Sequence, residues 1–593
     1  LGNETAYKYD KIGNLTAVTD ALGHLTTFAY DNNSNLIQTT DSLGNTTKNC
    51  YDLVNQLTQT VDQRNFVTKI SYDEAGNTTA ITNALNGTTA YEFNKRGLVV
   101  KVIDANGNRY DLEYDSAGNN TKIVAPNQSF LSYTYDSRNH LIESSDSEGL
   151  KTSYQYDKKG QLLKEENSAG ECKEYTYDAF GNITSLTNSL GQKTTYTYDV
   201  SKNLTSVTAL DGNTTQYEYD KMGNVIKITD SEGKAATYEY DKNNRLISKE
   251  DELLRTYQYT YDQLGNLTSD TNPLGEKNSY QYDLLGNLTQ VQDAAGAAKS
   301  FEYDSTGNLL SQKDQNGNKT SFTYDALGQV IAVEEADKSK QEYLYDALGN
   351  LIKYQDAAGN VTNYTYDSVS QLTQLTTPNG GSYAYTYDGH GNTTTVTDPL
   401  GGVTQLEYDQ NNQAVKRSLP NGAQYSYAYD QLGRLTKLEA PENQTRQYAY
   451  DSVGDLIQES DQAGRVVSYT YDKQHRLLTT TNEENATTSY TYDDAGNLSS
   501  VVSPLGSKTT YTYDVLDRIT TQTDPVGKVT ELTYDIVGNL TKLTENGGRS
   551  TQYGYDPVGN QTSVTNALLQ TTSYEYDNKN QVTGVIDAAG QKT

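Results

Sequence analysis

Four histidines and two cysteines are the side chains of this 593-residue chain with the widest range of chemistry. A histidine acts as a general base or metal ligand only when partner groups lie within hydrogen-bonding reach. The histidines lie in or beside turns far apart in the sequence, so no His/Ser/Asp or His/Cys grouping is indicated. We therefore predict no catalytic residue, no metal ligand and no cofactor-binding residue. The histidines are His24, His140, His390 and His475.

The two cysteines, Cys50 and Cys172, are expected to be lone thiols. Two cysteines in so long a chain do not make a disulfide framework. Cys50 occupies a polar, outward-facing position of an expected strand, and Cys172 precedes the next Tyr-x-Tyr strand by several residues. Neither position suggests a nucleophile.

Acidic turns offer a second kind of chemistry, because Asp and Asn oxygens are hard ligands suited to calcium. A calcium loop needs several alternating acidic residues close together, and neither an EF-hand loop nor a nonapeptide calcium repeat is present. Asp and Asn also open turns by bonding their own backbone. The sequence favours this structural role over calcium binding.

Asn-x-Thr/Ser sequons recur through the chain and are potential glycan acceptors in an exported protein. Their spacing shows that they arise from a repeated Gly-Asn-Leu-Thr segment, in which Asn suits a turn. We favour the turn role. Examples are Asn14, Asn182, Asn203, Asn266, Asn287 and Asn539.

All of these residues belong to one repeated unit of 21 residues. An Asp returns at Asp10, Asp31 and Asp52 and then every 21 residues to Asp577, with Asn94 as the one substitution. The 28 repeats contain no insertion or deletion, and 593 residues leave no room for a separate catalytic domain.

Each unit contains two segments rich in Thr, Tyr, Val and Leu, bounded by Asp, Gly and Asn, which predicts two strands. In the first, the residue before the repeat Asp is aromatic in all 28 units. Alternation places this ring and the residue two before it on one face, as a tyrosine ladder. The second segment spaces its apolar residues three apart, as at Leu15 and Val18, which predicts either a β-bulge or two half-buried faces.

The turns are equally regular. The third residue after the repeat Asp is Gly in 18 units, and Asn, Ser, Asp, Lys or His475 in the others. Gly, Asn, Asp and His tolerate positive φ best, so this position is predicted to be left-handed. The second turn of each unit, as at Asp20 to Gly23, follows the same chemistry.

The predicted fold is all-β: a continuous antiparallel β-meander of about 28 repeats, with two strands in each. A twisted open sheet of so many strands has to curl. We expect a hollow spiral, tube or shell of uniform curvature, with the tyrosine ladder buried on the concave side.

Composition limits the partners. The net charge of −30 and the pI near 4.5 exclude a nucleic-acid groove and an anionic membrane surface, which need clustered Lys and Arg. No apolar run is long enough to span a membrane, and no signal peptide is visible at the start. Neutral and cationic partners remain open, and carbohydrate on a Tyr and Thr wall is a weaker expectation.

The repeated unit resembles the YD repeats of the RHS family, as in Tyr259 to Thr268 (YTYDQLGNLT) and Tyr280 to Thr289 (YQYDLLGNLT). The resemblance covers essentially the whole chain and implies a β-strip that spirals into a hollow shell. Its members include polymorphic toxins, toxin-complex subunits, wall-associated proteins and teneurins. In the toxins the shell encloses a C-terminal effector that follows a self-cleaving core region. We find neither here, and the Asp-Pro pairs at Asp524 and Asp556 lie in ordinary repeats.

We interpret residues 1–593 as a single uniform repeat array, an internal fragment of a longer chain without caps, core or effector domain. The expected function is a non-enzymatic scaffold, extracellular or at the cell surface, that forms a rigid hollow tube or surface filament. One alternative is the encapsulating shell of a secreted toxin whose effector lies beyond Thr593, and another is a cell-adhesion module. The expected partners are an enclosed polypeptide or further copies in a filament.

Overall fold

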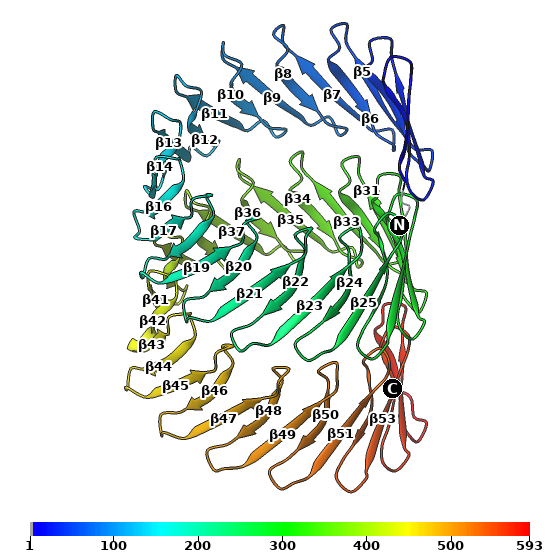
Figure 1. The fold of residues 1–593 in the computed structure, drawn as a ribbon, viewed down its shortest axis with the longest axis vertical. Coiled ribbons are helices and arrows are strands. Elements are labelled where there is room, and N and C mark those ends of the chain that lie inside the picture. The colour runs from blue at the N-terminus through cyan, green and yellow to red at the C-terminus, as the bar shows by residue number, and fades with distance from the viewer. Residues whose placement is uncertain (1–3) are drawn as a thin grey trace.

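A computed structural model describes residues 4–593. It contains 56 β-strands in one sheet, and each strand is antiparallel to its neighbours in chain order. Figure 1 shows this strip winding into a spiral whose coils lie one above another along the long axis, with the N-terminal coil (blue) at one end and the C-terminal coil (orange to red) at the other. The predicted all-β meander is therefore confirmed.

Two kinds of strand alternate. The odd-numbered strands, which we call Tyr strands, have six residues and end at the aromatic residue before the repeat Asp, as in β3 (Leu25–Tyr30) and β55 (Thr571–Tyr576). The even-numbered strands, which we call Thr strands, have five residues and begin five residues after that Asp, as in β2 (Leu15–Thr19) and β56 (Val582–Ile586). The strands that differ in length are β1 (Ala6–Tyr9), β14 (Leu141–Asp146), β16 (Leu162–Asn167), β42 (Leu435–Ala440), β43 (Gln444–Tyr450) and β44 (Leu456–Asp461).

A β-bulge occurs wherever a Tyr strand pairs with the Thr strand that follows it. In the first pair, Lys8 lies opposite Ala17 and Tyr9 opposite Leu15, so Thr16 has no partner. The same shift separates the last pair, β55 and β56. This decides between the two interpretations of the apolar spacing in favour of the bulge. A bulge bends its strand and increases the local twist, so its return in every repeat gives the strip a steady curvature.

Every repeat has two turns of nearly identical geometry, which we call the Tyr turn and the Thr turn after the strand that precedes each. In the first Tyr turn, Asp10 Oδ1 accepts the backbone N–H groups of Ile12 and Asn14, and Gly13 has φ +97°. This is a type I turn followed by a left-handed residue, a common three-residue hairpin. The left-handed prediction is confirmed, including at His475 (φ 63°).

One turn departs from the pattern. The Thr turn between β42 and β43 is the 3₁₀ segment Pro441–Asn443, in which Glu442 and Asn443 both have positive φ. Pro fixes its own φ near −65°, which suits the first position of such a turn. The expected uniformity therefore has one local exception.

The core is thinner than the sequence suggested. The strip is a single layer, and its tyrosine ladder is half-buried rather than buried, as are most residues of the Thr strands. The apolar side chains of residues 4–593 that are fully buried are small: Ala17, Ala236, Ala326 and Ala332. A sheet without a second layer has nothing to cover its faces except its own neighbouring side chains.

The tyrosine before the repeat Asp links neighbouring repeats by a hydrogen bond, which compensates for the thin core. Tyr261, at the end of β25 (Thr256–Tyr261), donates its O–H to the carbonyl oxygen of Leu246 at 2.9 Å. The acceptor lies 15 residues earlier, in the preceding repeat, and the same bond recurs at Tyr30, Tyr282 and Tyr576. Each ring is thus held by apolar contact on its body and by a hydrogen bond at its tip.

Candidate functional surface: the seam between coils

Successive coils meet along a seam of turns, and within residues 4–593 no strand of one coil pairs with a strand of another. The hydrogen bonds and ion pairs across the seam join residues 240 to 266 positions apart, which corresponds to about twelve repeats per coil. Each connects a Thr turn of the earlier coil to a Tyr turn of the later one. Ser42 donates to the carbonyl oxygen of Leu284, and Asn106 to the carboxylate of Asp346.

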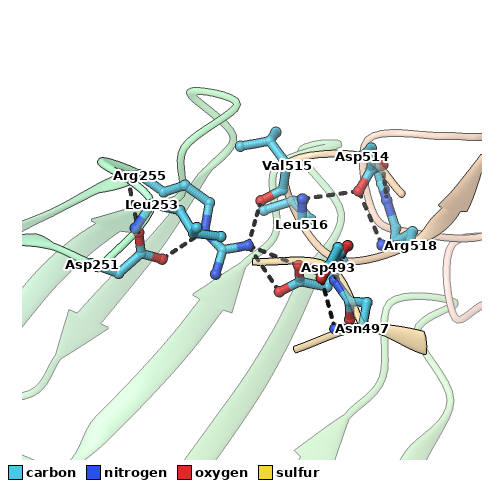
Figure 2. Close-up of polar contacts among 10 residues, drawn as sticks. Asp251, Leu253, Arg255, Asp493, Asn497, Asp514, Val515, Leu516 and Arg518 are labelled. Atoms are coloured by element: carbon cyan, nitrogen blue, oxygen red, sulfur yellow. Dashed lines mark hydrogen bonds and ion pairs between the residues drawn. The ribbon is translucent and has the colours of Figure 1, made fainter. Parts of the chain in front are cut away.

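Arg255 makes the most extensive of these contacts (Figure 2). Its Nε donates to Asp251 Oδ2 of its own turn at 2.6 Å. Its Nη1 donates across the seam to the carbonyl oxygen of Val515 at 3.2 Å and to both carboxylate oxygens of Asp517 at 2.9 Å. A planar guanidinium supplies several donors in fixed directions, which suits it to such a three-way contact.

Burial and hydrogen bonding have opposite effects on the charge of Asp251 in this contact. The Asp251 side chain is only 5% exposed. Burial alone would raise the pKa of Asp251, but hydrogen bonds from the side chain and backbone of Arg255 and from the backbone of Leu253 lower it below its usual value. The carboxylate is therefore charged at neutral pH and fixes Arg255 in position to reach the next coil.

Two other positively charged side chains make contacts across the seam, at separate points around the coil. The Arg64 guanidinium donates to the carbonyl oxygens of Asp325 and Ala326 at 3.3 and 3.1 Å. Lys579 Nζ lies 2.8 Å from Asp337 Oδ2, and this hydrogen bond is the main reason that the pKa of Asp337 is lowered to about 2. These contacts were missed by sequence reasoning, because a separation of about twelve repeats depends on the pitch of the spiral.

The structure places two of the four histidines in the seam. His390 Nε2 lies 2.7 Å from Asp146 Oδ2 of the preceding coil. His475 Nδ1 lies 2.7 Å from Asp455 in its own coil, and its Nε2 lies 3.6 Å from Asp211 in the preceding coil.

The other two histidines pair within their own turns. His24 lies 2.9 Å from Asp20, and His140 lies 3.0 Å from Asp136. The structure therefore brings each histidine to a carboxylate, but only His390 and His475 to a carboxylate of another coil.

Both cysteines are free thiols. Cys50 is exposed, as expected, whereas Cys172 begins strand β17 (Cys172–Tyr177) and is half-buried. The expectation that Cys172 precedes its strand by several residues is therefore wrong, because the Tyr strand starts earlier than its aromatic residues indicate. Burial raises the pKa of the Cys172 thiol, which keeps it protonated.

The turn carboxylates are occupied by their own turns. Asp262 Oδ1 accepts three backbone N–H groups, those of Leu264, Gly265 and Asn266, and Asp262 Oδ2 accepts the Asn266 side-chain amide. Within residues 4–593, no three His, Cys, Asp or Glu side chains are placed to hold a metal ion together.

The sequon asparagines take part in the same bonding. In each, the side-chain amide nitrogen that a glycan would occupy donates to the Asp four residues earlier. These residues are Asn14, Asn182, Asn203, Asn266, Asn287 and Asn539.

Three carboxylates on the tyrosine face were also missed by sequence reasoning. Glu165, Asp270 and Glu459 stand where most repeats have an apolar residue, and each accepts the O–H of a tyrosine ten positions later. Burial, and next the bond to the carboxylate, raise the pKa of Tyr175, Tyr280 and Tyr469 to about 12. The sequence does show the signal for these pairs: an acidic residue replaces the usual apolar residue ten positions before a tyrosine. These pairs keep the tyrosines protonated at neutral pH.

None of the helical residues in the described part of the chain forms a segment long and apolar enough to cross a membrane.

Comparison with known proteins places this geometry in a family. The Teneurin YD-shell model matches residues 45–144, 174–318, 231–364 and 360–488, which together make up more than half of the chain. The RHS Repeat model matches residues 9–46, 135–171, 492–529, 513–550, 534–568 and 555–592. No curated protein matches the sequence.

A solved structure with a TM-score above 0.5 supports the fold. The structure of the Photorhabdus luminescens Tc holotoxin pore is 12% identical, with a TM-score of 0.54 over 99% of this chain and 43% of that one. A crystal structure of TcdB2-TccC3-Cdc42 is 13% identical, with a TM-score of 0.49 over 98% of this chain and 38% of that one. The chain thus spans less than half the length of the structures it matches. On the strength of the two family matches and of a 21-residue, two-stranded repeat coiled into a spiral, the chain belongs to the RHS/YD-repeat family of YD shells.

Proposed function

We propose that this chain is a structural wall that works outside the cell, a rigid β-shell that surrounds a hollow and catalyses no reaction. The observation that carries the proposal is the seam, in which the Thr turns of each coil contact the Tyr turns of the next through Arg64, Arg255 and Lys579. A coiled strip whose successive coils touch along the seam separates an inside from an outside. Backbone ladders within each coil give the wall its stiffness.

What the wall surrounds distinguishes the two leading candidates. A long tube or surface filament fits the regular repeat, because every described coil is built from the same unit. An encapsulating shell around a polypeptide is favoured by the similarity in fold to a chain of the Tc holotoxin pore, which is more than twice as long as this one. An adhesion module has no specific observation in its favour.

Imaging of the native, full-length protein by cryo-electron microscopy tests the wall and its contents together. Closed particles with density inside would establish an encapsulated polypeptide, and long empty tubes would establish a filament. A flat or unwound strip would overturn the proposed wall.

Limited proteolysis supplies a second measurement. If the wall is closed, a polypeptide inside it is cut only after the coils are opened by denaturant. Hydrolase activity that stays with the purified repeat array would contradict the non-enzymatic part of the proposal.

A further inference from the structure

One pair of tyrosines differs from the rest of the ladder, because its two rings are in contact. Tyr343 lies in the Tyr strand β33 (Lys340–Tyr345), and Tyr354 lies directly opposite it in the Thr strand β34 (Leu351–Gln355). The ring centroids are 5.3 Å apart, and the ring planes are tilted by 40°. Within residues 4–593 this is the one contact between two tyrosine rings. Figure 1 labels both strands side by side in the green part of the strip.

The pair comes from two departures from the repeat in the same unit. The position of Tyr354, eight residues after the repeat Asp, is tyrosine in this unit alone. The position of Gln341, five residues before the repeat Asp, is Thr in most units and Gln in this unit alone. Alternation along the strand places Gln341 on the same face as Tyr343, and pairing places Tyr354 opposite Tyr343. The two unusual residues are therefore neighbours in space.

Gln341 holds the two phenol groups close together. Its side-chain oxygen Oε1 accepts the O–H of Tyr343 at 2.9 Å and the O–H of Tyr354 at 3.3 Å. A shared acceptor brings the hydroxyl-bearing ends of the two rings to the same place. The next tyrosine of the strand, Tyr345, donates instead to the carbonyl oxygen of Val330 in the preceding repeat, so it does not compete for Gln341.

The surroundings leave this pair open to oxidation. Both tyrosines are half-buried, so a small oxidant can reach them. Burial, followed by the charges that Tyr354, Tyr345 and Glu335 can carry, raises the pKa of Tyr343. Tyr343 is therefore a protonated phenol at neutral pH, and its oxidation removes a proton together with an electron.

We propose that Tyr343 and Tyr354 form an oxidative cross-linking site, at which hydrogen peroxide and a haem peroxidase join the two rings into dityrosine. The oxidant removes one hydrogen atom from each phenol. The unpaired electron of each phenoxyl radical is shared with its ortho carbons, and one ortho carbon of each ring forms the new carbon–carbon bond. Each bonded carbon then loses its hydrogen as a proton, and each oxygen regains one, which restores both phenols. One peroxide molecule takes up the two hydrogen atoms and becomes two water molecules.

The cross-link acts on a turn of the seam. It joins the two strands on either side of the Tyr turn of Asp346, whose carboxylate accepts the side-chain amide of Asn106 in the preceding coil. A covalent link between neighbouring strands restricts the unfolded hairpin, as a disulfide does. The link therefore fixes a turn through which two coils are in contact. The inference goes beyond the proposed wall and does not depend on what the wall encloses.

Peptide mapping after oxidation tests the site. The purified 593-residue chain is treated at low concentration with hydrogen peroxide and a haem peroxidase, and then digested with trypsin. Trypsin cleaves after Lys340 and Lys353, so it leaves Tyr343 and Tyr354 on different peptides. We expect mass spectrometry to find these two peptides linked, with the loss of two hydrogen atoms, and the product to show dityrosine fluorescence. The yield should not depend on protein concentration, because both rings belong to one chain.

Three variants test the assignment. Tyr354→Phe keeps a ring but cannot form a phenoxyl radical, so it should remove the linked peptides. The matched control is Tyr364→Phe in strand β35 (Val361–Tyr366), because Tyr364 is the counterpart of Tyr343 one repeat later but lies opposite Leu375; it should leave the yield unchanged. Gln341→Thr, which restores the common residue, should lower the yield about fivefold, as the loss of a typical hydrogen bond implies.

Hydrogen exchange measures the effect of the link on the hairpin. After oxidation, the backbone amides of β33 and β34 should exchange at least about tenfold more slowly in the wild-type chain and at an unchanged rate in Tyr354→Phe. Circular dichroism shows that each variant keeps its strands. Links spread over many tyrosines in proportion to their exposure, or linked peptides that persist in Tyr354→Phe, would overturn the site. Hollow particles formed by a chain that gives no cross-link would leave the proposed wall intact.

Discussion

Two kinds of contact hold this molecule in shape, and they differ in where their strength comes from. Within a coil, neighbouring strands share backbone hydrogen bonds, and in most repeats the tyrosine before the repeat Asp donates its O–H to the previous repeat, as from Tyr261 to Leu246. Between coils, the hydrogen bonds and ion pairs of residues 4–593 run from turn to turn, and in each a side chain reaches a side chain or a backbone atom, as from Arg255 to Asp517 and to the Val515 carbonyl oxygen. The contacts within the strip therefore provide most of the stability, and the contacts in the seam determine the pitch of the spiral. A substitution within a coil should change the free energy of unfolding, whereas one in the seam should change the shape.

The largest expected effect comes from the tyrosine ladder. Tyr261→Ala removes a half-buried ring and its hydrogen bond, and should destabilise the strip locally by about 2 kcal/mol, less than the cost of emptying a fully buried aromatic site. Tyr261→Phe removes only the hydrogen bond and should cost about 1 kcal/mol. Hydrogen exchange of strands β24 (Leu246–Glu250) and β25 measures both. Equal costs for the two variants would show that ring packing contributes nothing.

A smaller effect is expected at the left-handed turn position. Leu569 has φ 63° and is 84% exposed, so Leu569→Gly loses no packing and relieves a strained backbone. The gain should be about 1 kcal/mol. Gly548 occupies the equivalent position one repeat earlier, with open space around it, so Gly548→Leu should cost a similar amount. Chemical denaturation checks the pair, and changes of the same sign would contradict the argument.

The seam is tested by two arginines that differ in reach. Arg245 and Arg255 each bind an Asp four residues earlier, but only Arg255 also contacts the next coil. Arg245→Gln and Arg255→Gln should therefore lower stability similarly, by about 1 kcal/mol, because backbone N–H groups of the turn still bond the Asp carboxylate in each variant. Only Arg255→Gln should lengthen the distance between coils.

Spin labels measure that distance when they are placed in the Thr turn of Asp230 and the Tyr turn of Asp493, in a chain with Cys50 and Cys172 replaced by serine. An unchanged distance in Arg255→Gln would show that the seam does not depend on this residue.

The smallest expected effect is a pH dependence of the seam at His475. The hydrogen bond to Asp455 raises its pKa, burial opposes the shift, and the charges of Asp455, Asp211 and Asp451 add to it. A raised pKa in the folded state means that protonation stabilises the fold around His475, chiefly through Asp455 of its own coil and to a smaller extent through Asp211 across the seam. This stabilisation is complete below the ordinary histidine value of about 6.5 and is lost as pH rises through the higher folded value.

The inter-coil distance, followed by the same labels from pH 5 to pH 9, should therefore increase towards alkaline pH. His475→Gln should remove the change, whereas His140→Gln should not, because His140 pairs only with Asp136 of its own turn. A pH response that survives in His475→Gln would assign it to another group.

The repeat itself made the strip predictable. Every strand and turn is decided by neighbours within one or two units, so the alternation at Tyr196 and Tyr198 and the Gly after Asp10 were sufficient to predict strands and left-handed turns. The sequence left open whether Leu15 and Val18 reflect a bulge, because both alternatives give the same spacing; only the pairing register distinguishes them.

The seam could not be predicted in this way. Whether His390 meets Asp146 depends on how many repeats complete one coil, and that number is the sum of many small bends and twists along the strip. An error of one repeat moves every seam contact to the wrong partner. The burial of the tyrosine ladder was overestimated for a related reason. Tyr261 is a large aromatic residue of the kind found in protein cores, but a single-layer sheet has no second layer for its ring to pack against.

The direction of the Tyr O–H bond has a consequence for biosynthesis. In most repeats, the tyrosine before the repeat Asp donates to a carbonyl oxygen that lies 15 residues nearer the N-terminus, and each strand pairs first with the strand made just before it. No bond within a coil waits for residues far downstream, so the strip can be completed hairpin by hairpin in the order in which the ribosome makes it. A growing chain, or one threaded N-terminus first through a narrow export channel, would expose only its last unfinished repeat to misfolding or proteolysis.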